Sequence, residues 1–140
     1  MNAKTQTAAI SENLVLDDRI RGVPPGTANL PIAEVAEQNW RPTGGVMSLP
    51  VLTLDEAAFA NNRELMLRYV SELGVDIAPH AKTPMSPDLT ASLIEAGAWG
   101  ATVADIRQAA VLLHAGVHRL ILANEVGGRG GAARDRKSVV

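Results

Sequence analysis

The regular alternation of short apolar runs and helical periods after Ser48 constrains this fold more than any other feature. Four apolar runs have the length of β-strands, at residues 50–54, 75–79, 101–104 and 120–123. Each interval between them is long enough for a helix, and a helix between consecutive strands is typical of parallel pairing with right-handed crossovers. The sequence therefore predicts an α/β fold with the element order βαβαβαβ.

The ends of the three helices are indicated by residues with known capping preferences. The first predicted helix ends at Gly74. The second begins at Ser86, which is followed by proline, and ends at Gly97; the third begins at Asp105 and ends at Gly116. The apolar face residues are, for the three helices in turn, Phe59, Met66, Val70 and Leu73; Leu89, Leu93 and Ala96; and Ile106, Ala109, Ala110 and Leu113.

A weak internal repeat supports this order. Residues 96–98 and 103–105 recur nineteen positions later as residues 115–117 and 122–124, so that each repeat is one helix-to-strand step. Repeated steps build either an open doubly wound sheet or a (β/α)8 TIM-type barrel, and such a barrel takes about 250 residues. Because the chain has 140 residues, we expect the N-terminal part of a barrel, with about three βα units.

Both ends of the chain lack the alternation of helical and strand patterns seen in this region. Residues 1–48 are interrupted by prolines and glycines, which predicts an irregular N-terminal arm with one short helix beginning at Pro31. Residues 135–140, Asp-Arg-Lys-Ser-Val-Val, resemble the translation of a common sequencing-adapter oligonucleotide. We expect an artefactual tail there, with a native charged C-terminus as the alternative. The partial barrel is expected over residues 49–134.

Composition excludes several classes of partner and site. The 13 Lys and Arg against 15 Asp and Glu leave a formal net charge of −2, which does not favour nucleic acid. The sequence has no cysteine, which excludes disulfides and thiolate metal sites within it. The beginning lacks the apolar region of a signal peptide, and no stretch approaches the ~18 apolar residues of a membrane span. We expect a cytoplasmic protein with no membrane partner.

Lys82 is the one lysine within the alternating region, since Lys4 lies in the arm and Lys137 in the tail. It follows the run at residues 75–79, and the carboxyl ends of parallel strands are where α/β barrels place their active sites. An amine there can be desolvated and attack a carbonyl group, with a solvated loop lysine as the alternative. His80 lies two residues earlier, on the same side of an extended chain, where it could stack on a ring or relay a proton.

Other residues carry weaker indications. The glycine-rich run at residues 127–131 could cradle a phosphate, but it matches neither the P-loop nor the dinucleotide-binding pattern. His114 and His118 flank a helix end, where they complement the helix dipole, so no metal site is expected. Asn124 and Glu125 end the last predicted strand and could line a pocket.

Residues 77–87 read Ile-Ala-Pro-His-Ala-Lys-Thr-Pro-Met-Ser-Pro, and residues 95–104 read Glu-Ala-Gly-Ala-Trp-Gly-Ala-Thr-Val-Ala. They closely resemble the start of the pyridoxal-phosphate barrel of the alanine-racemase type (fold type III), in the branch of D-serine dehydratases, D-threonine aldolases and bacterial amino acid deaminases. That branch carries its cofactor lysine in a Pro-His-x-Lys-Thr segment, followed by a helix and an Ala-Gly-x-x-Gly-(small)-Thr-(apolar)-Ala strand. The resemblance extends from about Leu49 to about Gly128, and Ala81 stands where glycine is commoner in the deaminases.

The resemblance implies that Lys82 binds pyridoxal 5'-phosphate covalently and acts in catalysis, with His80 and Thr83 near the cofactor. It implies a homodimeric parent enzyme, a lyase or deaminase that converts a D-hydroxy amino acid to a 2-oxo acid and ammonia. Aldol cleavage or racemisation on the same fold is the alternative. The family's metal ligands lie in later parts of its sequences. We therefore expect a fragment that is inactive alone and has no metal ligand of its own.

Two other classes of function stay open. A non-catalytic pyridoxal-phosphate-binding barrel would also carry a lysine, although that family presents it in a different local motif, without the Pro-His pair. A phosphate- or nucleotide-binding α/β domain would use the run at residues 127–131 and would require an open sheet.

Overall fold

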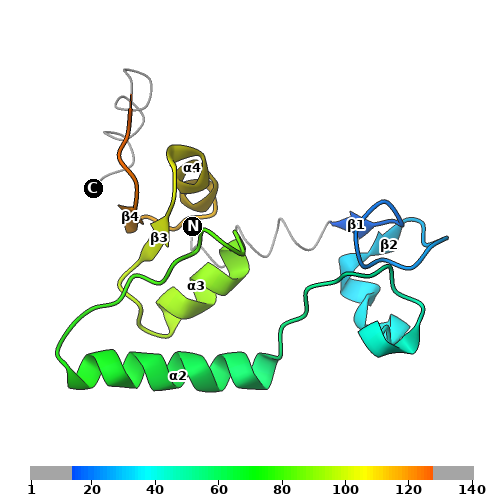
Figure 1. Ribbon diagram of the computed structural model, residues 1–140, viewed down its shortest axis with the longest axis horizontal. Coiled ribbons are helices and arrows are strands. Elements are labelled where there is room, and N and C mark those ends of the chain that lie inside the picture. Colours follow the sequence, from blue (N-terminus) through cyan, green and yellow to red (C-terminus); the bar gives the residue numbers. More distant parts are fainter. Residues whose placement is uncertain (1–13, 128–140) are drawn as a thin grey trace. The chain divides into compact units, whose positions relative to one another are not determined.

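The computed structural model describes residues 14–127, and these fall into two compact units (Figure 1). One unit ends at Asp55 and the other begins at Glu56. The alternation of helices and strands lies in the second unit, so the chain is an α/β protein there. The tail expected at residues 135–140 lies outside the described residues, and the arm boundary expected after residue 48 stays a prediction.

The first unit contains a two-stranded antiparallel sheet and three 3-10 helices. Strand β1 (Val15–Leu16) pairs with β2 (Leu30–Pro31). The 3-10 helices follow at Ile32–Glu34, Ala36–Gln38 and Pro42–Gly44. The short helix expected in the arm is therefore present as two consecutive 3-10 helices. Strands of two residues leave no periodicity in a sequence, so the small sheet escapes prediction.

The prediction of a strand at residues 50–54 is wrong. No strand pairing among the described residues involves this run, and Leu52 is 93% exposed. An apolar run becomes a strand only when a neighbouring strand shares its backbone hydrogen bonds. Pro50 also lacks the N–H group that a ladder requires.

Helix α2 (Glu56–Glu72) forms where the apolar period predicts it, and Gly74 follows it in the left-handed conformation with φ 65°. The burial of its apolar face differs from the expectation, because no residue of α2 is buried. Met66 is 50% exposed, and Leu73, just after the helix, is 58% exposed. An amphipathic helix buries its apolar stripe only where another element covers it. Within the second unit, the described residues cover this face of α2 only in part, since Phe59 and Val70 are half-buried.

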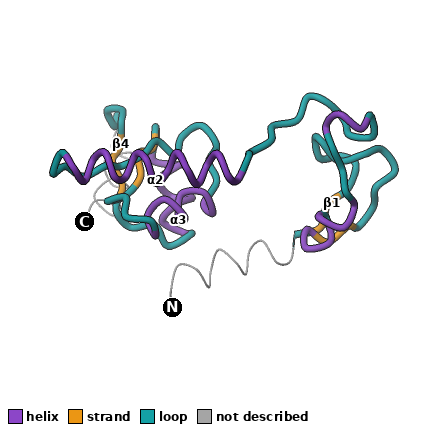
Figure 2. Tube along the Cα trace, turned by 90° about the horizontal axis from the view of Figure 1, so that it is seen from below, coloured by secondary structure: helices purple, strands orange, loops and turns teal. Residues whose placement is uncertain are grey.

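Helices α3 (Pro87–Glu95) and α4 (Ile106–His114) begin and end as predicted. The Ser86 hydroxyl accepts a hydrogen bond at 3.3 Å from the N–H three residues later, which satisfies a donor left free at the start of α3. Gly97 and Gly116 follow the two helices with positive φ angles. Helix α3 lies alongside α2 in both views of the chain (Figures 1 and 2). No helix in the described part of the chain is long and apolar enough to cross a membrane.

Strands β3 (Ala101–Val103) and β4 (Leu120–Leu122) pair in parallel, as predicted. Each residue of β3 lies opposite the residue nineteen positions later, beginning with Ala101 and Leu120. This register is the same as the offset of the internal repeat. The repeat is therefore confirmed as one helix-to-strand step that places equivalent residues side by side in the sheet.

The run at residues 75–79 lies extended beside β3 but is assigned as a strand nowhere along its length. His80, directly after it, forms a single parallel bridge with Thr102. The Pro79 carbonyl accepts the Thr102 N–H at 2.8 Å, and the Thr102 hydroxyl donates to the Ala78 carbonyl at 2.7 Å. The predicted strand is thus an extended segment held to β3 by hydrogen bonds, with no strand partner on its other side among the described residues.

The core of the second unit lies between the sheet and α4. Val103 and Leu112 are fully buried, and the other members are alanines and one valine. Small side chains let helix and sheet approach closely, which leaves little space for larger substitutions. The buried cluster consists of Ala81, Ala101, Val103, Ala109, Leu112 and Val117.

We expect Gly100→Ala to destabilise the second unit by about 1–3 kcal/mol, the range for overpacking. An added Cβ would clash with the Arg119 carbonyl oxygen, a backbone atom that cannot rotate away. Gly127→Ala is the matched control, because no atom of the described residues lies within 4 Å of the added Cβ. Urea denaturation followed by circular dichroism measures both variants, and equal midpoints would contradict the prediction.

Candidate functional site

The turn that carries Lys82 starts at the edge of the sheet. The N–H of Ala81, a buried residue, donates to the Thr102 carbonyl at 2.8 Å. The Ala81 carbonyl accepts the N–H of Met85 at 2.9 Å, which closes the turn over the three residues between them. Met85 itself has a left-handed φ of 43°. The structure therefore places Lys82 two residues after the bridge at His80, on the carboxyl side of the parallel sheet.

His80, Lys82 and Thr83 lie within this short stretch, and all three are exposed. Within residues 14–127 the Lys82 ammonium forms no ion pair. Behind the turn, between it and α3, lies a cavity of about 30 Å³, lined by residues that include Pro84 and Leu89. This volume holds about one water molecule. The cavity beneath the turn is therefore too small for a ring-sized molecule.

Two side-chain amides connect this turn to the neighbouring strands. Gln108 Oε1 accepts the backbone N–H of Ala104 at 2.8 Å, and Gln108 Nε2 donates to the Lys82 carbonyl at 3.3 Å. Asn124 Nδ2 donates to the Ala104 carbonyl at 2.8 Å. Ala104 directly follows β3, and Asn124 lies two residues after β4. The amides thus link the Lys82 turn, the end of β3 and the end of β4.

Asp105 sets the position of Gln108. Its carboxylate accepts the backbone N–H groups of Arg107 and Gln108 at 2.8 and 3.0 Å and so caps α4. An N-cap acceptor followed three residues later by Gln is the pattern of a capping box, in which the Gln usually returns to the N-cap N–H. Here it returns to the N–H of Ala104, one residue earlier. Sequence reasoning missed Gln108: the Asp-x-x-Gln spacing predicts the cap, but not the contact with Lys82, 26 positions away.

The cap also fixes the charge of Asp105. The hydrogen bond from the Gln108 N–H has the largest effect and lowers the pKa of this carboxyl below its ordinary value of 3.8. Burial opposes it as the next largest effect, and the N–H and guanidinium of Arg107 lower the pKa further. At neutral pH the start of α4 therefore carries a carboxylate, which the helix dipole favours.

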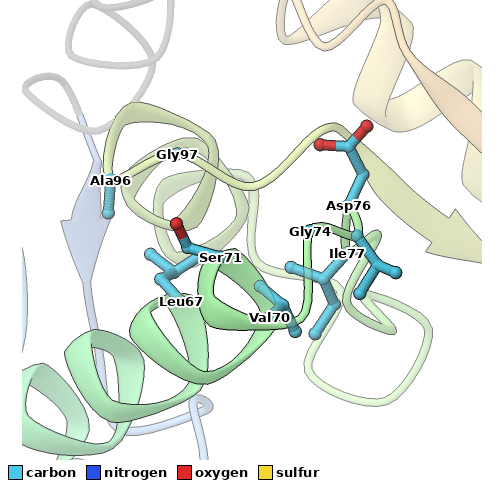
Figure 3. A pocket seen from close by; sticks show the side chains of 9 residues that line it. Leu67, Val70, Ser71, Gly74, Asp76, Ile77, Ala96 and Gly97 are labelled. Atoms are coloured by element: carbon cyan, nitrogen blue, oxygen red, sulfur yellow. The ribbon is translucent and has the colours of Figure 1, made fainter.

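A groove of about 510 Å³ lies at the other end of the extended segment (Figure 3). It runs between the end of α2 and the end of α3, and Asp76 is the one charged residue in its lining. No amine lines it, so the groove offers no group that could condense with a carbonyl compound. Its lining consists of Leu67, Val70, Ser71, Gly74, Val75, Asp76, Ile77, Ala96 and Gly97.

The remaining sequence candidates are not brought together into a site. The glycine-rich run at residues 127–131 lies outside the described residues beyond Gly127. His114 and His118 are exposed. In the part of the chain that the structure describes, no three His, Asp or Glu side chains gather as metal ligands would. The Lys82 turn with its two amides is therefore the candidate site.

Comparison with solved structures finds a related enzyme. The chain is similar to a D-threonine aldolase from Filomicrobium marinum, with 28% identity and a TM-score of 0.62. The alignment covers 65% of this chain and 24% of the aldolase chain, so this chain spans about a quarter of the aldolase. No family model and no curated protein matches the sequence.

This similarity supports the relation to the fold type III enzymes that the sequence indicates. D-threonine aldolases are one branch of the family that residues 77–87 resemble. The structural match thus agrees with the motif. The narrower assignment to the D-serine dehydratase-like deaminases rests on the sequence resemblance alone.

The Asp105→Asn variant tests the contribution of the Asp105 charge to stability, measured as a function of pH. Because the pKa of Asp105 is lowered in the folded chain, its charge stabilises the fold above about pH 3.8, and this contribution is lost as the pH falls through the lower folded value. Asn keeps the acceptor but cannot titrate. We expect a lower urea midpoint for the variant at neutral pH, and a difference between the two proteins that shrinks as the pH falls below 3.8. Parallel acid declines would show that other carboxyls carry the effect.

Proposed function

We propose that this chain is part of a pyridoxal-phosphate-dependent enzyme of fold type III that acts on a small amino acid. Lys82 is the covalent attachment site of the cofactor. The observation that carries this proposal is the exposed Lys82 turn at the carboxyl edge of a parallel sheet, where α/β barrels place their active sites. The similarity to a D-threonine aldolase supports the same class.

The residues of the turn suit this cofactor. The Lys82 amine is exposed and has no ion-pair partner within the described ranges, so an aldehyde can reach it. We assign His80 to the face of the ring and the Thr83 hydroxyl to a hydrogen bond with the cofactor. When bound, pyridoxal phosphate accepts the electron pair that remains on Cα after a bond to Cα is broken.

Two reactions fit this chemistry. The deaminase reaction removes the Cα proton and the β-hydroxyl of a D-hydroxy amino acid as water, and hydrolysis of the resulting enamine gives a 2-oxo acid and ammonia. The second candidate is aldol cleavage, in which the Cα–Cβ bond breaks and gives an aldehyde and glycine. The structural similarity to an aldolase favours this second reaction. We propose a cytoplasmic homodimer as the working form in either case.

Borohydride trapping tests the role of Lys82. The chain is incubated with pyridoxal phosphate and reduced with borohydride, and the labelled lysines are identified by peptide mapping. We expect Lys82 to be labelled several-fold faster than Lys4 and Lys137, because only Lys82 lies in the candidate site. The two other lysines report the reaction of ordinary amines in the same molecule. Lys82→Ala should abolish the fast label, and Lys4→Ala should leave it unchanged.

Equal labelling of the three lysines would refute the attachment site. The products distinguish the two reactions once Lys82 is labelled. Incubation with D-threonine should release glycine and an aldehyde if the enzyme is an aldolase, or a 2-oxo acid and ammonia if it is a deaminase. Labelling without either product, in a parent protein of full length, would favour the non-catalytic cofactor-binding class.

A further inference from the structure

The backbone on both sides of Lys82 is held by hydrogen bonds. The peptide group before it carries the Ala81 carbonyl, which accepts the Met85 N–H at 2.9 Å. The peptide group after it carries the Lys82 carbonyl, which accepts Gln108 Nε2 at 3.3 Å. Since peptide groups are planar, a bond to each of them restrains the two backbone dihedrals at the Cα between them. These two bonds therefore restrain the direction in which the Lys82 side chain leaves the backbone.

Only one of these bonds comes from outside the turn. The Met85 bond is local, whereas Gln108 belongs to the first turn of α4, on the far side of β3 in the sequence. The Gln108 amide has one arrangement that satisfies both contacts, because the Ala104 N–H needs an oxygen and the Lys82 carbonyl needs an N–H. The Asp105 cap holds the Gln108 backbone in place. Gln108 thus connects the lysine to a rigid element of the next helix-to-strand step.

We propose that Gln108 is a positioning residue for Lys82, an inference that rests on the proposed function. Its Oε1 anchors the side chain on Ala104, and its Nε2 orients the peptide group that follows the lysine. Rigid support of this kind places a reacting group within the narrow geometry that its chemistry requires. Gln108 itself contacts neither cofactor nor substrate in this proposal.

Gln108→Glu separates positioning from helix capping. A glutamate keeps the acceptor for the Ala104 N–H, and its charge is favourable at a helix start, but it has no donor for the Lys82 carbonyl. Gln108→Met removes both contacts and serves as the second variant. Gln38→Glu is the matched control: it makes the same charge change in the first unit, where the Gln38 amide donates to the Glu34 carbonyl at 3.4 Å.

The first measurement needs no cofactor. Trypsin cleaves after Lys82 only when the turn opens. We expect Gln108→Glu to raise the rate of this cleavage about fivefold, the order of one lost hydrogen bond, while the urea midpoint and the Gln38→Glu protein stay unchanged. An unchanged rate of cleavage after Lys82 in both Gln108 variants overturns the proposal.

The second measurement follows the trapping of pyridoxal phosphate at Lys82 over a range of cofactor concentrations. We expect the limiting rate at Lys82 to fall about fivefold in Gln108→Glu, with the half-saturating concentration and the rate at Lys4 unchanged. Faster cleavage with an unchanged limiting rate overturns the proposal, because the bond would then hold the turn without positioning the amine. If Lys82 of the parent chain labels no faster than Lys4, the proposed function fails, and the cleavage rates still decide whether Gln108 fixes the turn.

Discussion

Three hydrogen bonds made by Thr102 hold the candidate site to the rest of its unit. The Thr102 N–H donates to the Pro79 carbonyl, its carbonyl accepts the Ala81 N–H, and its hydroxyl donates to the Ala78 carbonyl. Thr102 is 7% exposed, so these bonds lie away from water, where hydrogen bonds are electrostatically stronger. The turn with Lys82 begins at Ala81, which makes the last of these bonds along the chain. Thr102 of β3 therefore sets the position at which the turn with Lys82 begins.

The starts of α3 and α4 also hold the candidate site in place. Ser86 caps α3 directly after the turn, and Asp105 caps α4 directly after β3. Each cap satisfies backbone donors that a helix cannot satisfy itself. Gln108 is the third residue of α4. Its backbone N–H donates to the Asp105 cap, and its side-chain amide donates to the Lys82 carbonyl. The turn is thus bounded by an extended segment and a helix and linked to a second helix, although it has no regular structure of its own.

Structural features that depend on residues close together in the sequence could be predicted from it. The caps at Ser86 and Asp105 and the parallel pair with its nineteen-residue offset are encoded within a few residues of where they act. The run at residues 50–54 and the burial of the α2 face depend on neighbouring elements, which an apolar pattern does not specify. The position of Lys82 at the end of an extended segment could be anticipated. The bond from Gln108 could not, because it depends on the rotamer of a side chain 26 residues away.

The equal length of the two helix-to-strand steps makes residues nineteen apart physical neighbours. Val103 faces Leu122 across the sheet, as Ala101 faces Leu120. Substitutions at two such positions share packing partners, so their effects on stability are not additive. A directed-evolution library for this protein should therefore vary these positions in pairs, since volume-conserving exchanges are tolerated best.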